Sequence, residues 1–93
     1  MTKKERFNRL SEMGCIVCKL YYSVYTAPEI HHLTGLKYRS TGKKANDDNT
    51  IGLCLNHHRQ GDLNNPSVHA RPAKFTEMYG SQEDLLKLTN ELL

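Results

Sequence analysis

The sequence predicts a small α+β domain that is held together by a zinc ion. The chain has 93 residues, of which 38% are hydrophobic, so it can bury only a modest core. A domain of this size often needs additional stabilisation, such as a bound metal ion. Its three cysteines are an odd number, which fits metal ligation better than a set of disulfides. Helical patterns at both ends enclose a middle part that favours strands. We expect one domain over residues 1–93.

The first third of the chain predicts one helix followed by β-structure. Residues 2–13 have an amphipathic pattern, and Gly14 would end that helix. The CIVC stretch at 15–18 is expected to form a tight turn. Residues 19–33 are rich in Tyr and Val and predict two short strands that Pro28 separates, the second of them in EIHHL.

The middle of the chain predicts a loop, a strand and a helix. Residues 34–50 form a polar stretch with two Gly and four Lys or Arg, which favours a loop. The apolar IGLC stretch at 51–54 is expected to be a short strand. A helix would begin within LNHHRQGD at 55–62. Strand, loop, strand and helix would therefore follow one another closely.

The C-terminal part predicts two helices after an irregular connector. These helices occupy residues 70–93 and are divided by Gly80. Ser81 and Asp84 form an S-x-x-D capping box ahead of a leucine-rich amphipathic pattern. We therefore expect the second helix to begin directly after Ser81.

The cysteines predict a closed zinc site. Cys15-x2-Cys18 has the spacing that lets two thiolates turn toward one ion, and Cys54-x2-His57 repeats the spacing with an imidazole. Together the four residues supply the tetrahedral ligand set of a structural site. The alternative is three free cysteines with a chance C-x2-C. The matching C-x2-H favours zinc.

The histidines predict a second site. Four of the five stand in two adjacent pairs, His31–His32 and His57–His58. On a strand, neighbouring side chains face opposite sides, so one of the first pair could bind a metal while the other faces a substrate. Once His57 is given to zinc, His58 is left for the second site, and His69 can join it. The alternative for each is a surface histidine or a hydrogen-bonded core histidine.

The order of these motifs resembles an HNH endonuclease with a ββα-metal site. The matching features are C-x2-C, EIHHL, a basic loop with glycine, and N-x4-C-x2-H-H, between Cys15 and His69. The tail H-x5-F-x3-YGSQEDLL is similar to small phage and prophage HNH proteins, including the Ref-like recombination-enhancement nucleases. The resemblance implies one HNH nuclease domain with a core at 15–69 and C-terminal helices at 70–93.

The resemblance also implies a role for each matching residue. His31 would be a ligand of the catalytic metal and His32 the general base. Asn49 would brace the loop and orient the base, with Asp47 as a nearby competitor for that role. His58 would be the second metal ligand.

The third metal ligand stays open between two residues. Asp62 stands four residues after His58, where a helix would place its carboxylate on the same face. His69 lies beyond the GDLNNPSV segment, and its distance to the YGSQ tail matches the Ref-like pattern. We favour His69 and keep Asp62 as the fallback.

The implied function is hydrolysis of DNA phosphodiester bonds with one divalent ion, Mg²⁺, Mn²⁺ or Zn²⁺, beside the structural zinc. The first 46 residues carry nine Lys or Arg against three acids, which suits a polyanion. Cations expected to hold backbone phosphates are Lys37, Arg39, Lys43 and Lys44, with the N-terminal Lys3, Lys4, Arg6 and Arg9. A recombinase filament on DNA is the partner that the resemblance implies.

Two other classes of protein compete with this interpretation. A zinc-binding DNA module without catalysis would explain the cysteines but has no need of a second histidine pair or Asn49. A zinc hydrolase of another substrate would need an H-E-x-x-H or H-x-E pattern, which is absent from the sequence. The chain has neither a long apolar run nor a signal-peptide pattern. We expect a cytoplasmic protein, in the host cytoplasm if a phage encodes it.

Overall fold

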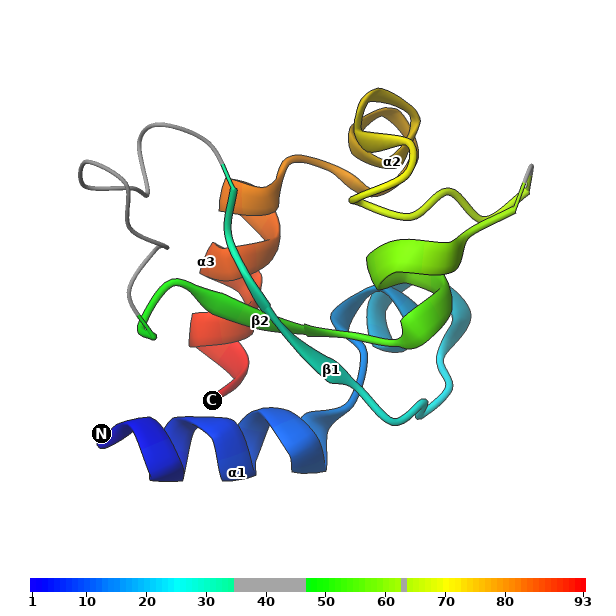
Figure 1. Ribbon diagram of the computed structural model, residues 1–93. Helices are drawn as coiled ribbons and strands as arrows, with labels where there is room; N and C mark the ends of the chain where they lie inside the picture. Colours follow the sequence, from blue (N-terminus) through cyan, green and yellow to red (C-terminus); the bar gives the residue numbers. More distant parts are fainter. Residues whose placement is uncertain (35–46, 63) are drawn as a thin grey trace.

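The fold is a twisted pair of strands with helices around it (Figure 1). It is known from a computed structural model that describes residues 1–34, 47–62 and 64–93. In chain order the elements are α1 (Lys3–Met13), η1 (Cys18–Tyr22), β1 (Glu29–His32), β2 (Thr50–Leu53), η3 (Asn56–Gln60), α2 (Pro72–Tyr79) and α3 (Gln82–Leu92). The segments η1 and η3 are short turns of π-helix. Four predicted phosphate contacts lie outside the described residues: Lys37, Arg39, Lys43 and Lys44.

The short strands predicted in EIHHL and IGLC are both present, and they pair antiparallel. Their register pairs Glu29 with Leu53, His31 with Ile51, and His32 with Thr50. Successive side chains on a strand face opposite sides, so His31 is buried whereas His32 is partly exposed. The register therefore separates the two histidines of the first doublet.

The strand predicted between residues 19 and 25 is wrong, because this stretch begins with the helical turn η1. The CIVC stretch is also helical at its end rather than a simple tight turn. The amide of Lys19 donates to the carbonyl of Cys15, and the amide of Val24 donates to that of Cys18. Aromatic and β-branched residues favour a strand only where a pleated neighbour covers them, and here the rings of Tyr21 and Tyr22 stay half exposed.

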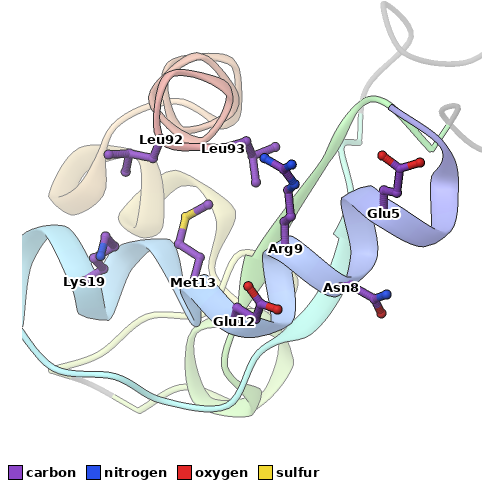
Figure 2. A pocket seen from close by; sticks show the side chains of 8 residues that line it. All are labelled: Glu5, Asn8, Arg9, Glu12, Met13, Lys19, Leu92 and Leu93. Atoms are coloured by element: carbon purple, nitrogen blue, oxygen red, sulfur yellow. The ribbon is translucent and has the colours of Figure 1, made fainter.

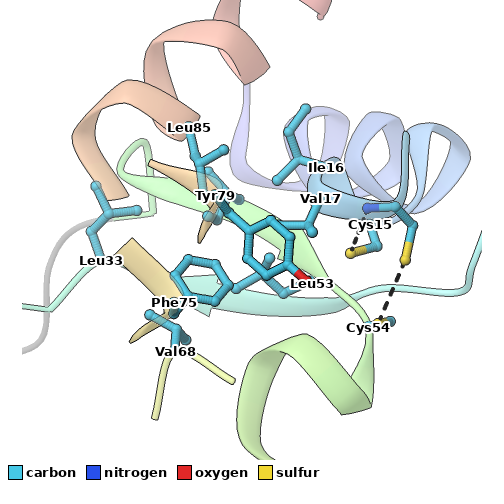
Figure 3. Close-up of a cluster of buried hydrophobic side chains, with 12 residues drawn as sticks. Cys15, Ile16, Val17, Leu33, Leu53, Cys54, Val68, Phe75, Tyr79 and Leu85 are labelled. Carbon is cyan, nitrogen blue, oxygen red and sulfur yellow. Dashed lines mark hydrogen bonds between the residues drawn. The ribbon is translucent and has the colours of Figure 1, made fainter. Parts of the chain in front are cut away.

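The hydrophobic core lies between the sheet, the start of η1, α2 and α3 (Figure 3). Both α1 and α3 contact β2, and α2 supplies the two aromatic rings at the centre. The buried apolar side chains include Ile16, Val17, Leu33, Ile51, Leu53, Val68, Phe75, Tyr79 and Leu85. Cys15, Cys18 and Cys54 are part of the same buried cluster, so the predicted zinc ligands sit at the edge of the core.

The predicted helix boundaries at both ends of the chain are confirmed. Thr2 caps α1, and Gly14 ends it with a φ of 86°, a conformation that costs little only for glycine. The hydroxyl of Ser81 accepts a hydrogen bond from the amide of Asp84 at the start of α3. Among the described residues, the helices are too short and too polar for any of them to cross a bilayer.

Arg6 joins α1 to the rest of the fold instead of reaching out to phosphate. Its guanidinium donates to the hydroxyl of Thr50 at 2.9 Å, to the carbonyl of Thr50 at 2.6 Å and to Asn90 Oδ1 at 2.9 Å. The side chain is buried, and this burial lowers its pKa from the ordinary value. The prediction that Arg6 contacts DNA is therefore wrong.

Candidate metal centres

The four predicted zinc ligands converge on one point. Their ligand atoms lie within 4.8 Å of one another, although the residues come from separate segments. Cys15 precedes η1, Cys18 begins it, Cys54 directly follows β2, and His57 lies in η3. The nitrogen Nδ1 of His57 lies 3.8 Å from the sulfur of Cys15, 3.6 Å from that of Cys18 and 3.2 Å from that of Cys54. The Cys18 and Cys54 sulfurs are 3.9 Å apart, so no disulfide joins them.

These separations fit the edges of a tetrahedron around a zinc ion. Zinc binds sulfur at about 2.3 Å and imidazole nitrogen at about 2.0–2.1 Å, which places neighbouring ligand atoms about 3.5–3.8 Å apart. Burial raises the pKa of Cys15 to about 12, and it also raises the pKa of Cys18. Thiolates at these positions therefore need a cation beside them. The cluster can hold a structural metal such as zinc.

Local backbone geometry prepares this cluster. The amide of Cys18 donates to the sulfur of Cys15 at 3.5 Å, because the chain turns into η1 between the two cysteines. His57 is fixed from the other side by Tyr22, whose ring stacks on the imidazole at an interplanar angle of 10°. Burial lowers the pKa of His57, which keeps its imidazole neutral as a ligand must be.

Three further histidines form a second cluster. The ligand atoms of His31, His58 and His69 also lie within 4.8 Å of one another, and the Nε2 atoms of His58 and His69 are 3.1 Å apart. His31 comes from β1, His58 from η3 and His69 from the connector before α2. Whereas His31 is buried, the side chain of His58 is 15% exposed and His69 is exposed. The cluster therefore opens to solvent on one side.

The position of His69 follows from a sharp turn at Gly61. This glycine has a φ of 66°, and an added Cβ would lie 2.7 Å from the amide nitrogen of Ser67. The chain then runs back beside η3, where the amide of Val68 donates to the carbonyl of His57 and the amide of His69 to that of His58. Two backbone hydrogen bonds thus hold His69 next to His58.

The same turn takes Asp62 away from the histidines. The prediction that Asp62 shares a helical face with His58 required a helix that continues to residue 62. The helical segment η3 ends at Gln60 instead. The carboxylate of Asp62 instead accepts hydrogen bonds from the amides of Asn64 and Asn65. The structure therefore brings His69 to the cluster and leaves Asp62 outside it.

Two residues that sequence analysis missed contact the second cluster. Glu29 Oε1 lies 2.9 Å from Nδ1 of His58, and the same carboxylate accepts two hydrogen bonds from Arg59. Gln82 Oε1, at the start of α3, lies 2.9 Å from Nε2 of His31. The hydrogen bonds from Arg59 and from His58 lower the pKa of Glu29 to about 2, and burial lowers that of His31 to about 4.

The other histidine of the first doublet faces a carboxylate. Nε2 of His32 lies 2.8 Å from Oδ1 of Asp47, and Lys3 approaches the second oxygen of Asp47 at 3.7 Å. The hydrogen bond with His32 lowers the pKa of Asp47. Asn49 accepts a backbone hydrogen bond from the amide of Leu33 through its carbonyl. Asp47 thus contacts the His32 ring through its side chain.

A comparison with protein families decides the identity of the chain. The family model described as "Recombination enhancement, RecA-dependent nuclease" matches residues 1–93. The chain belongs to this nuclease family. No curated protein and no solved structure matches it.

The family match indicates that this small protein is a nuclease, and the two clusters are candidate metal sites in it. A RecA-dependent nuclease acts on DNA and is linked to RecA, in agreement with the predicted partner class. The match covers both clusters, together with α3 and the predicted Ref-like tail. The recombination-enhancement nuclease predicted from the tail motif is therefore confirmed.

The hollow between α1 and the end of α3 in this RecA-dependent nuclease lies apart from both clusters (Figure 2). It has a volume of about 690 Å³, and no cysteine or histidine lines it. Arg9, another predicted phosphate contact, lines this hollow together with Glu5 and Glu12. Lys19 lines it as well, so the hollow carries two basic and two acidic side chains. The remaining predicted contacts on α1, Lys3 and Lys4, are exposed.

Proposed function

We propose that this nuclease is a metal-dependent endonuclease of the HNH type, with its reaction centre at the His31–His58–His69 cluster. The observation that supports this most strongly is the division of the first histidine doublet. His31 enters the cluster from one face of β1, whereas His32 faces Asp47 from the other. One short strand thus presents a metal ligand and a second, non-ligand imidazole side by side, which is what general-base hydrolysis at a metal centre requires.

The three imidazoles fit a divalent transition ion. The His58–His69 nitrogen separation of 3.1 Å matches two ligands of one ion, because metal–nitrogen bonds of about 2.0–2.1 Å place neighbouring nitrogens about 3 Å apart. Imidazole suits Zn²⁺ and similar ions, whereas Mg²⁺ prefers oxygen ligands. When bound, such an ion stabilises the charge that develops on a phosphate under attack. The open side at His69 leaves space for the phosphate oxygen.

His32 is our candidate for the general base. Asp47 Oδ1 can only accept, so a neutral His32 donates to it from Nε2 and keeps a lone pair on Nδ1. That lone pair would take a proton from the attacking water. The role that the resemblance assigned to Asn49, orienting the base, passes in this proposal to Asp47, which the sequence named as its competitor. Asn49 would brace the turn between the loop and β2 through its backbone.

The cysteine cluster would stabilise the fold, and basic residues would bind the DNA backbone. Cys15, Cys18, Cys54 and His57 would hold a structural zinc that stabilises the fold. Backbone phosphates of DNA would be held by Lys37, Arg39, Lys43 and Lys44, and by Lys3 and Lys4 on α1. Such contacts fix position without reading sequence. A RecA filament on DNA would supply the specificity, in line with the family description.

The test is a nicking assay on DNA with and without RecA filaments, with His32→Ala as the decisive variant. We expect this variant to keep its fold and both metals but to cleave about 10²–10⁴-fold more slowly, since a general base contributes about that much. The control is Glu77→Ala, at an exposed position on α2, which should cleave like the parent. Cleavage by His32→Ala at the parental rate under saturating metal would remove the assignment of the base.

A parent protein that never cleaves DNA, even on RecA filaments, would favour a zinc-containing DNA-binding module. Metal analysis of the same sample separates this result from a failure to load the ion. If about two metal ions are bound per chain and DNA stays intact, the hydrolytic proposal is wrong.

A further inference from the structure

We propose that Gln82, the first residue of α3, is a positioning residue of the nuclease centre. It would hold the hydrogen of His31 on Nε2 and so leave Nδ1 as the nitrogen that binds the ion. This inference rests on the proposed function, because it concerns the same metal ligand. It extends the reaction centre to a helix that lies outside the 15–69 segment on which the HNH resemblance rests.

The orientation of the Gln82 amide is fixed by Thr34. Oε1 of Gln82 accepts a hydrogen bond from the backbone amide of Thr34 at 3.1 Å. A backbone amide can only donate, so the atom that faces it must be the oxygen. On the other side, Nε2 of Gln82 donates to the hydroxyl of Thr34 at 2.9 Å. The two contacts leave one way to place the amide.

The oxygen of Gln82 in turn fixes the tautomer of His31. The same Oε1 lies 2.9 Å from Nε2 of His31, and a carbonyl oxygen cannot donate. Nε2 must therefore carry the hydrogen, and a neutral imidazole then has its only lone pair on Nδ1. His31 is 2% exposed, so its ring is shielded from bulk water. The opposite tautomer would set two lone pairs against each other in a buried place.

The fold gives Gln82 a fixed position. Ser81 caps α3, and the first turn of the helix is anchored by Leu85, which is buried in the core. Gly80 turns the chain between α2 and α3 with a φ of 94°. The helix itself contacts β2, the partner strand of His31. The cap at Ser81, the buried Leu85 and the contact of α3 with β2 thus fix the position of Gln82.

The first measurement is the tautomer of His31 in the metal-free protein with an intact structural site. Long-range ¹H–¹⁵N correlation spectra distinguish a hydrogen on Nε2 from one on Nδ1. We expect Nε2–H in the parent, in Gln82→Glu and in the control Lys87→Ala, an exposed position on the same helix. Gln82→Ala should show the Nδ1–H form or a mixture. The carboxylate of Gln82→Glu should rescue the tautomer because it still accepts the hydrogen bond.

The second measurement is the affinity of these proteins for Zn²⁺ and Mn²⁺ at the histidine cluster. Loss of a partner that orients a metal-binding histidine typically costs about 10–100-fold in affinity. We expect a loss of this size in Gln82→Ala and a much smaller one in Gln82→Glu. An Nδ1–H tautomer in the parent, or a Gln82→Ala protein with parental tautomer and affinity, would overturn the proposal.

The two measurements separate this inference from the proposed function, because neither of them needs cleavage. If the tautomer and the affinities behave as expected but DNA is never cut, the hydrolytic function fails and the positioning role stands. If cleavage of DNA depends on His32 but the tautomer of His31 does not depend on Gln82, the hydrolytic function stands and the positioning role fails.

Discussion

The cysteine cluster and the histidine cluster each include one of two adjacent residues of η3, His57 and His58, and the clusters differ in how exposed they are to solvent. The cysteine cluster has four candidate ligands, none of them more than 9% exposed, and it adjoins the hydrophobic core. The histidine cluster has three ligands, and His69 is exposed. Structural zinc sites are closed by four protein ligands, whereas catalytic sites keep a position open for water or substrate. In the proposed function, the adjacent pair His57–His58 would serve one centre of each kind.

The two clusters also differ in the kinds of side chain that contact them. Around the cysteines, aromatic rings pack against the cluster, such as Tyr22 and Tyr79 against the ring of His57. Around the histidines, polar side chains hold the rings: Glu29 for His58 and Gln82 for His31. A structural site needs its ligands only to converge. A reactive site also needs each ring in a set tautomer and direction, and this requires hydrogen-bond partners.

The largest effect is expected from breaking the cysteine cluster. Cys54→Ser should lose the structural zinc and with it the folded state, since binding of structural zinc contributes about 10–16 kcal/mol in zinc-finger peptides. Circular dichroism and metal analysis would measure both losses. His58→Ala, which removes only a ligand of the open site, should remain folded with one zinc bound. Well-folded Cys54→Ser protein would show that the core alone stabilises the chain.

Chelation should separate the two centres in one sample. Three imidazoles with an exposed edge ought to release their ion to EDTA before three thiolates and a buried imidazole do. We therefore expect nicking to stop while the circular dichroism spectrum is unchanged, and the fold to be lost only with stronger chelation or longer exposure. Addition of Mn²⁺ or Zn²⁺ at the first stage should restore cleavage. Simultaneous loss of activity and fold would mean that only one metal centre exists.

A pair of substitutions sharpens the ligand set of the open centre. His69→Ala should raise the metal concentration needed for half-maximal nicking by at least about tenfold, because one of three ligands is gone. Asp62→Ala should leave it near the parental value, since the Asp62 carboxylate is engaged with Asn64 and Asn65. Titrations of nicking against Mn²⁺ would measure both. The reverse order of effects would return the role to Asp62.

The smallest of these effects is expected at Glu29. Glu29→Gln can orient its amide oxygen toward Nδ1 of His58 but loses the negative charge and the paired contact with Arg59. We expect a weakening of metal binding of about tenfold, at the lower end of the range for such partners. Arg59→Ala is the matched control, since it breaks only the ion pair. Equal losses in both variants would assign the effect to the ion pair and not to His58.

The sequence predicted the parts of both centres that depend on spacing. Two C-x2-C/H pairs and a histidine doublet on a strand have short-range geometry that any backbone of that type reproduces, and Cys15, Cys18, Cys54 and His57 do converge. The helices with caps at Thr2 and Ser81 were predictable for the same reason. Within each pair and at each cap, the signal and its structural effect lie within a few residues, although the two C-x2-C/H pairs meet across 36 residues of sequence between Cys18 and Cys54.

The errors concern contacts between distant segments. The aromatic residues after Cys18 favour a strand locally, but the start of this stretch is drawn into a helical turn next to the cysteine cluster. The sequence around Arg6 indicates a surface cation, but its partners Thr50 and Asn90 are 44 and 84 residues away along the chain. Glu29 and Gln82 stand out in no local pattern, because their meaning depends on which histidine the fold places beside them. Gly61 is the one missed signal that local reasoning could have used, since glycine there would end a helix.

The three-way hydrogen bonding of Arg6 has a consequence for the order in which the chain assembles. Asn90, one of the partners of Arg6, is synthesised 84 residues after it. Until then the guanidinium has no complete set of acceptors, and burial of an incompletely paired cation is unfavourable. We therefore expect α1 to dock only when synthesis of α3 is finished. Nascent chains should already protect the cysteine thiols while α1 is still open to protease, and loop-closure entropy over so long a span makes this docking a late step.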